Sequence, residues 1–130
     1  MGDVTGSVQK ADWKSEKHVP VIEAPSKVKQ GEVFEVKVSV GKEIPHPNTT
    51  EHHIRWISVY FQPDGDKFTY QIARFDFGAH GESVKGPNQG PAYTEPKASV
   101  MMKVNGAGTL QAVSLCNIHG LWESSAAITT

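Results

Sequence analysis

Residues 33–40 read VFEVKVSV and alternate between apolar and polar side chains. Every even-numbered position of this segment is apolar, and Glu, Lys and Ser occupy positions 35, 37 and 39. A period of two places the apolar side chains on one face of an extended strand. No segment of the chain shows a sustained period of 3.6 residues instead. The alternation therefore restricts the chain to a fold built from strands with one buried face.

Five further segments have strand character and end at turn residues. Residues 54–61 are rich in β-branched and aromatic side chains and stop at a Pro-Asp-Gly-Asp turn. In residues 67–77 the alternation shifts phase, which predicts a bulge or a strand that changes sheets. The other predicted strands are residues 97–104, 109–115 and 124–129. About seven short strands joined by turns are typical of an immunoglobulin-like β-sandwich, so we predict an all-β fold.

The length and composition fit one domain. At 130 residues with 38% hydrophobic side chains, the chain can bury one core and leaves no room for a second domain. Residues 1–12 are polar and contain glycine, so we expect a flexible N-terminal tail followed by a single β-sandwich over residues 13–130. Two long loops, residues 41–53 and 78–96, are the expected carriers of function, here a loop-borne metal site.

Charge and hydropathy exclude two classes of partner. The net charge is −1 and no basic stripe with interleaved aromatic residues is present, so nucleic acid is not an expected partner. No run approaches the roughly 18 apolar residues of a membrane span, and residues 1–14 lack the apolar core of a signal peptide. A single cysteine agrees with a reducing compartment. The sequence therefore predicts a cytoplasmic protein without membrane attachment.

The only cysteine, Cys116, is followed three residues later by His119. A single thiol forms no intrachain disulfide, so it binds a metal, attacks a substrate or packs as a small apolar residue, and the nearby imidazole favours the first two. His18, His46 and His52 also fall in predicted loops or at strand ends. Imidazole and thiolate together suit iron, copper or zinc rather than Ca²⁺ or Mg²⁺, and the spacing does not separate those three metals.

Three separated motifs resemble the superoxide reductases, the desulfoferrodoxin and neelaredoxin group of non-haem iron proteins. They are EKHVP at residues 16–20, His-Pro-x-x-x-x-His from His46 to His52 with IRWI at 54–57, and CNIHGLW at 116–122. The resemblance covers roughly residues 12–123. Some members carry four more cysteines in an N-terminal rubredoxin-like centre, and this chain has none of these, so it resembles the one-iron class.

The resemblance implies one iron ion per chain, Fe²⁺ or Fe³⁺, and a ligand for each of its five positions. Its equatorial ligands would be the imidazoles of His18, His46, His52 and His119, and its axial ligand the thiolate of Cys116. In the family, backbone N–H groups at the positions of Ile118 and His119 donate to the sulfur. An anionic thiolate opposite an open position pushes electron density onto the metal, and such donors tune its potential.

The resemblance also implies a reaction and its participants. Superoxide, one electron and two protons would give hydrogen peroxide, with Lys17 attracting the anionic substrate and stabilising developing negative charge. Glu16 would become a sixth ligand of ferric iron after turnover and help the product leave. The electron donor would be rubredoxin, and the chain would form a homo-oligomer such as a tetramer.

Other interpretations of these residues stay open. A blue-copper electron carrier also combines a β-sandwich with cysteine and histidine, but no methionine follows His119 as its weak axial ligand. A metal-free immunoglobulin-like interaction module would leave Cys116 an inert thiol, and Glu16 and Lys17 an ordinary solvated pair. His53 and His80 are predicted to lie outside the ligand shell. Trp122 is expected to pack near the site with its indole N–H paired.

Overall fold

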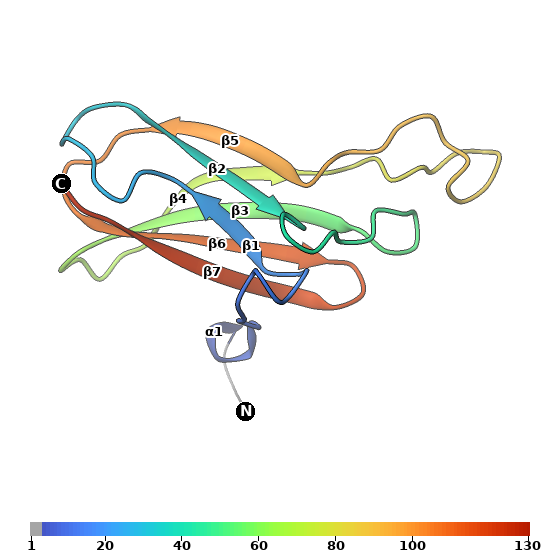
Figure 1. Cartoon of the computed structure of the whole chain (residues 1–130), viewed down its shortest axis with the longest axis horizontal. Coiled ribbons are helices and arrows are strands. Elements are labelled where there is room, and N and C mark those ends of the chain that lie inside the picture. The colour runs from blue at the N-terminus through green and yellow to red at the C-terminus, as the bar shows by residue number, and fades with distance from the viewer. Residues whose placement is uncertain (1–3) are drawn as a thin grey trace.

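The structure is a computed structural model that describes residues 4–130. Within this range seven strands form two antiparallel sheets that face each other as a sandwich (Figure 1). The elements are α1 (Val4–Ser7), β1 (Pro20–Glu23), β2 (Phe34–Val40), β3 (Ile54–Pro63), β4 (Tyr70–Asp76), β5 (Lys97–Met102), β6 (Gly108–Cys116) and β7 (Gly120–Ile128). The predicted all-β sandwich of about seven strands is confirmed.

The two sheets contain different numbers of strands. One has three strands in the order β1-β2-β5, and the other has four in the order β4-β3-β6-β7. The inner strands β3 and β6 pair antiparallel over nearly their whole length, from Ile54 opposite Cys116 to Pro63 opposite Gly108. Cys116 therefore lies where the pairing of the two inner strands ends.

The core fills the space between the sheets and also determines which way Cys116 points. On β2 the alternating side chains from Phe34 to Val40 are buried, as their spacing predicts. On β6 every second residue is buried from Gly108 onward, with Leu110 fully inaccessible. Cys116 lies an even number of residues after Leu110 on the same strand. The alternation that buries Leu110 therefore also turns the thiol inward, at 1% exposure.

The structure confirms one detail of the strand predictions, corrects another and adds a strand. The predicted phase shift in residues 67–77 is a register shift of β4 opposite Val59 and Tyr60, which confirms the bulge. β7 begins at Gly120 rather than at residue 124, so His119 lies in a three-residue turn between paired strands. Gly120 has a φ of 78°, a conformation that only glycine adopts without strain. β1 was not predicted, because four residues are too few for a periodic pattern to show.

The segment before β1 follows the outer side of the four-stranded sheet. Gln9 forms a parallel bridge with Trp122, in which Gln9 N–H donates to the carbonyl of Leu121 (3.0 Å) and Glu123 N–H donates to the carbonyl of Gln9 (2.9 Å). The flexible tail over residues 1–12 stays a prediction, and its first three residues lie outside the described range. In residues 4–130 no helix is long and apolar enough to cross a membrane.

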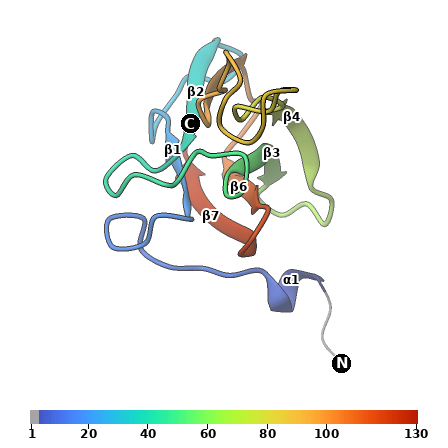
Figure 2. The same cartoon turned by 90° about the vertical axis from the view of Figure 1, so that its right-hand side faces the viewer.

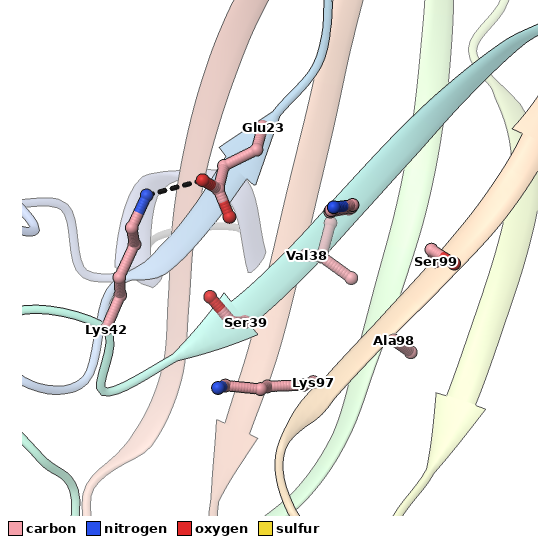
Figure 3. Close-up of a pocket in the computed structure, with 8 residues that line it drawn as sticks. Glu23, Val38, Ser39, Lys42, Lys97, Ala98 and Ser99 are labelled. Carbon is pink, nitrogen blue, oxygen red and sulfur yellow. Dashed lines mark hydrogen bonds and ion pairs between the residues drawn. The ribbon is translucent and has the colours of Figure 1, made fainter.

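A pocket of about 420 Å³ opens on the β1-β2-β5 sheet. Figure 3 shows Lys42 and Lys97 among its lining residues, with the Lys42 ammonium paired to the Glu23 carboxylate. The same ammonium lies 5.5 Å from the ring centroid of Trp13. Lys42 thus connects the start of the long 41–53 loop both to β1 and to the segment that precedes Glu16.

Candidate metal centre

The five predicted ligands converge at one end of the sandwich, which faces the viewer in Figure 2. His18 lies two residues before the start of β1 and His52 two residues before the start of β3, whereas His46 lies earlier in the loop between β2 and β3. Cys116 is the last residue of β6, and His119 lies in the turn that leads to β7. Strand ends and the loops between them therefore bring together residues from three distant parts of the sequence.

The four imidazole rings form a closed circuit. Neighbouring ring centroids are 4.9 Å apart for His18 and His46, 4.8 Å for His46 and His52, 5.0 Å for His52 and His119, and 4.5 Å for His119 and His18. The diagonal from His18 to His52 is longer, at 6.2 Å. Sides of similar length with a longer diagonal describe a four-cornered arrangement of rings around a common centre.

The ring nitrogens inside this circuit have more lone pairs than hydrogens. His119 Nδ1 lies 3.0 Å from His18 Nε2, 3.3 Å from His52 Nε2 and 3.7 Å from Cys116 Sγ. These four potential ligand atoms all lie within 4.8 Å of one another. A neutral imidazole has one hydrogen for its two nitrogens, so neighbouring protein hydrogens do not satisfy the whole group. Nitrogen and sulfur donors crowded in this way fit a transition-metal ion.

Two hydrogen bonds fix which nitrogen of the ring carries the lone pair. His18 Nδ1 is 2.6 Å from the Glu16 carboxylate, and His46 Nδ1 is 2.6 Å from the carbonyl oxygen of Pro47. Both partners only accept, so each Nδ1 carries the hydrogen and each Nε2 presents its lone pair. Outer partners of this kind orient metal-binding imidazoles and select their tautomer.

His46 contributes the ring that is not within the 4.8 Å group of ligand atoms. Its Nε2 is buried and has no hydrogen-bond partner in the part of the chain that the structure describes. Burial lowers the pKa of His46 to about 4, so the ring is neutral near pH 7. A buried nitrogen acceptor without a partner is unusual, and a metal ion in the centre of the circuit would supply one.

The sulfur and the last histidine are held by their immediate surroundings. Of the two predicted N–H donors, His119 N–H lies 3.4 Å from Cys116 Sγ, and donation from Ile118 stays a prediction. The Trp122 ring stacks on His18 at 4.9 Å between centroids, and its Nε1–H donates to the carbonyl of His119 (3.2 Å). The indole N–H is therefore paired, as expected, and its partner is the backbone carbonyl of a candidate ligand.

Lys17 and Glu16 both lie beside the imidazole circuit. After burial, which is the largest cause, the positive charge of Lys17 also contributes to lowering the pKa of His46 and His52. The charge of Lys17 therefore acts on two of the candidate ligands. Glu16 is engaged with His18 through both the ring and the backbone N–H (3.1 Å), and its role as a sixth ligand stays a prediction.

Asn88 is a residue of this region to which the sequence analysis assigned no role. It has a φ of 60°, a left-handed conformation that asparagine tolerates better than most residues. Its side-chain oxygen accepts from Thr50 N–H (2.8 Å), its Nδ2 donates to the Glu51 carboxylate (2.8 Å), and its N–H donates to Thr50 Oγ1 (3.1 Å). The long loop 78–96 is thereby fixed to the loop of His52. The only sequence signal was a Pro-Asn-Gln-Gly turn.

His53 and His80 form a separate buried pair. Their rings stack at 3.5 Å between centroids with 8° between planes. His53 Nδ1–H donates to the carbonyl of Thr49 (2.9 Å), and His80 Nδ1 lies 3.3 Å from the Glu82 carboxylate. The pair therefore packs the 78–96 loop against the residue that follows His52.

We expect His80 to make this contact sensitive to acid. Burial, followed by the neighbouring His53, lowers the pKa of His80 below its usual value of 6.5, although Glu82 opposes the shift. A folded-state pKa below the unfolded one gives stability that is complete above about pH 6.5 and is lost as the pH falls. The urea midpoint of metal-free protein should therefore fall more between about pH 7.5 and 5 in the wild type than in His80→Phe. An equal fall of the urea midpoint in both proteins would contradict the assignment of this pH dependence to His80.

A β-sandwich that gathers a buried thiol and imidazole nitrogens at one end has the donor set of a metal-binding β-protein. Comparison with known proteins identifies the family. Residues 10–125 match the desulfoferrodoxin family, and the chain belongs to it. Its length and the coverage of its relatives agree with the one-domain class, which was predicted from the absence of four further cysteines.

Relatives and solved structures agree closely with this assignment. The chain is 59% identical over 120 residues to the neelaredoxin of Megalodesulfovibrio gigas, with 92% of each chain covered. It is 57% identical over 121 residues to the superoxide reductase of Pyrococcus furiosus, covering 93% of this chain and 95% of that one. The reduced superoxide reductase (neelaredoxin) of Archaeoglobus fulgidus superimposes with a TM-score of 0.87 at 58% identity, covering 95% of this chain and 98% of that chain.

Proposed function

We propose that this protein is a superoxide reductase, which converts superoxide, one electron and two protons into hydrogen peroxide. The observation that carries the proposal is the convergence of Cys116 Sγ with ring nitrogens of His18, His52 and His119 within 4.8 Å. Membership of the desulfoferrodoxin family favours iron, one Fe²⁺ or Fe³⁺ per chain, among the metals that this donor set suits. We include His46 as the fourth imidazole because its buried Nε2 has no partner among the described residues.

Iron bound here would supply the electron, and the thiolate would push electron density toward the bound substrate. The protein contributes the rest. Glu16 and Pro47 hold hydrogens on the outer nitrogens of His18 and His46, so that both inner lone pairs are available. Lys17 supplies the positive charge that attracts a small anion and stabilises negative charge on it. For Glu16 to act as a sixth ligand after turnover, its carboxylate must leave the His18 ring.

The function is tested by metal analysis combined with visible spectroscopy. We expect about one iron per chain, since residues 4–130 contain one such donor cluster, and a thiolate-to-iron absorption band in the oxidised protein. The reduced, colourless protein should regain this band on mixing with superoxide and should produce hydrogen peroxide without releasing oxygen. Copper in place of iron, or no bound metal, would refute the proposal.

Replacing Lys17 with alanine should slow the reaction without removing the metal. Because Lys17 donates no ligand atom to the cluster, iron content and absorption should match those of the wild type. The second-order rate constant with superoxide should fall, most at low ionic strength, where attraction between charges is least screened. Lys14→Ala is the matched control, since it removes the same charge from the same loop, where Lys14 lies over the Trp13 ring. Equal rates for the Lys17 and Lys14 variants would remove Lys17 from the mechanism.

The donor, assembly and location of the protein complete the proposal. We propose rubredoxin as the electron donor and a homotetramer as the assembly, which would protect the edge strands β1, β4, β5 and β7 from non-specific pairing. A buried thiol that serves as a metal ligand has to stay reduced, which supports a cytoplasmic location. The copper alternative gains no support, since Met101 and Met102 lie on β5, in the sheet opposite the one that carries Cys116.

A further inference from the structure

Asn117 joins the two segments that carry Cys116 and His52. Its side-chain oxygen accepts a hydrogen bond from His53 N–H (2.8 Å), and its Nδ2 donates to the carbonyl oxygen of Glu51 (2.9 Å). Its own backbone N–H donates to the carbonyl of His53 (3.2 Å). One residue therefore bonds to the backbone on both sides of His52 while standing directly beside Cys116 in the sequence.

The side chain of Asn117 continues the hydrogen-bonding pattern between β3 and β6 beyond the last paired residues. Pairing between β3 and β6 ends at Ile54 opposite Cys116. Beyond that point, the amide group of Asn117 supplies both a donor and an acceptor, as a peptide group of a neighbouring strand would. The Asn117 amide needs the Glu51 carbonyl and the His53 N–H at the same time. Both bonds therefore form with only one orientation of the backbone around His52.

Two other groups of hydrogen bonds hold the backbone around His52. Thr49 and His52 close a small turn, in which Thr49 N–H donates to the carbonyl of His52 (2.9 Å) and His52 N–H lies 3.0 Å from Thr49 Oγ1. Asn88 fixes that turn to the 78–96 loop, which carries none of the predicted ligands. The bonds of Asn117 thus connect the backbone of this turn to the strand end that bears the thiol, beside the pairing of Ile54 with Cys116.

We propose that Asn117 is a positioning residue, which sets His52 at the correct place relative to Cys116 and His119. This inference rests on the proposed function only in treating these residues as metal ligands. The bonds of Asn117 orient the backbone that carries a ligand, and outer partners of ligands affect metal affinity by about 10–100-fold when they are lost. Asn117 itself is not within the group of ligand atoms.

Two substitutions separate the two halves of this contact. Asn117→Asp keeps an acceptor for His53 N–H but places an oxygen where the Nδ2 group faces the Glu51 carbonyl at 2.9 Å. Asn117→Ala removes both bonds. Asn105→Asp, in the exposed turn between β5 and β6, is the matched control for the change of charge. Asn88→Gly is the second control, because glycine keeps the positive φ while the side-chain bonds to Thr50 and Glu51 are lost.

Metal affinity is measured by titrating metal-free protein with Co²⁺ and following the thiolate-to-cobalt absorption. Both Asn117 variants should bind Co²⁺ with about 10–100-fold lower affinity than the wild type, whereas the affinity of Asn105→Asp should match that of the wild type. Asn88→Gly should weaken binding less than either Asn117 variant. Wild-type affinity in both Asn117 variants would overturn the inference.

Hydrogen exchange in the metal-free protein gives a readout that does not depend on activity. In Asn117→Ala the amide of His53 should exchange faster, while that of Val59 in the buried part of β3 should keep its protection. An equal loss of protection at both amides would show a general effect on folding and would also overturn the inference. If the wild type binds Co²⁺ through the thiol but does not react with superoxide as the iron protein, the proposed function fails and the positioning role stands.

Discussion

Cys116→Ser should abolish the thiolate-to-iron absorption band and lower the rate constant with superoxide by more than about 100-fold, the upper end of the effect of losing an outer partner. The thiol is 1% exposed and lies 3.7 Å from His119 Nδ1, so its replacement removes a buried donor from the group of ligand atoms. A serine hydroxyl stays protonated near neutral pH and is a harder donor than a thiolate. The measurement is the visible spectrum of the oxidised variant, together with stopped-flow kinetics of the reduced one.

Cys116→Ala provides the control for this prediction. It removes the donor without introducing a hydroxyl, so both variants should lose the band even if their metal contents differ. Thermal unfolding of the metal-free proteins shows whether each variant is folded. A Cys116→Ser protein that keeps the full band would show that a different group is the source of the absorption, and the axial assignment would be wrong.

His46→Ala should produce the second large effect, a loss of iron affinity that imidazole in solution restores. The side chain leaves a gap in the circuit of rings, between His18 and His52, into which a free imidazole can diffuse. Its Nε2 would replace the buried nitrogen that has no protein partner among the described residues. Iron affinity and the visible spectrum are measured with and without added imidazole.

The outcome of this rescue decides the number of imidazole ligands. Restoration by imidazole, without restoration by a similar concentration of pyrrole, which has no free lone pair on nitrogen, would identify a missing ligand. Unchanged iron affinity and spectrum in His46→Ala would instead limit the site to the three histidines whose nitrogens converge with the thiol within 4.8 Å.

The parts of the fold that were predictable have strong local patterns. β2 alternates in sequence because one face of the strand packs in the core, and the structure buries the residues that the pattern selects. The start of β7 was placed four residues too late because its first residues, Gly-Leu-Trp-Glu, are all half-buried and do not alternate. Their burial depends partly on Gln9, which pairs with Trp122 from the other end of the chain.

The same distinction applies to the site. Each candidate ligand lies in a short motif, so the chemical types of the donors could be identified from the sequence. The order of the rings, the stacking of His53 on His80 and the bonds of Asn117 arise only when distant loops meet. Asn88 is separated from Thr50 by 38 residues, and no local pattern in either segment indicates the other as its partner.

The contact between His18 and His119 has a consequence for how the protein unfolds. These residues are 101 positions apart in the chain, yet their ring nitrogens lie 3.0 Å from each other. A metal ion bound to both would act as a reversible cross-link that closes about three quarters of the polypeptide into one ring. Closing a loop of this length covalently contributes about 4.7 kcal/mol in the chain-entropy description of disulfides. Loading with metal should therefore raise the free energy of unfolding as well as enable chemistry, because it constrains the unfolded chain much as a disulfide would.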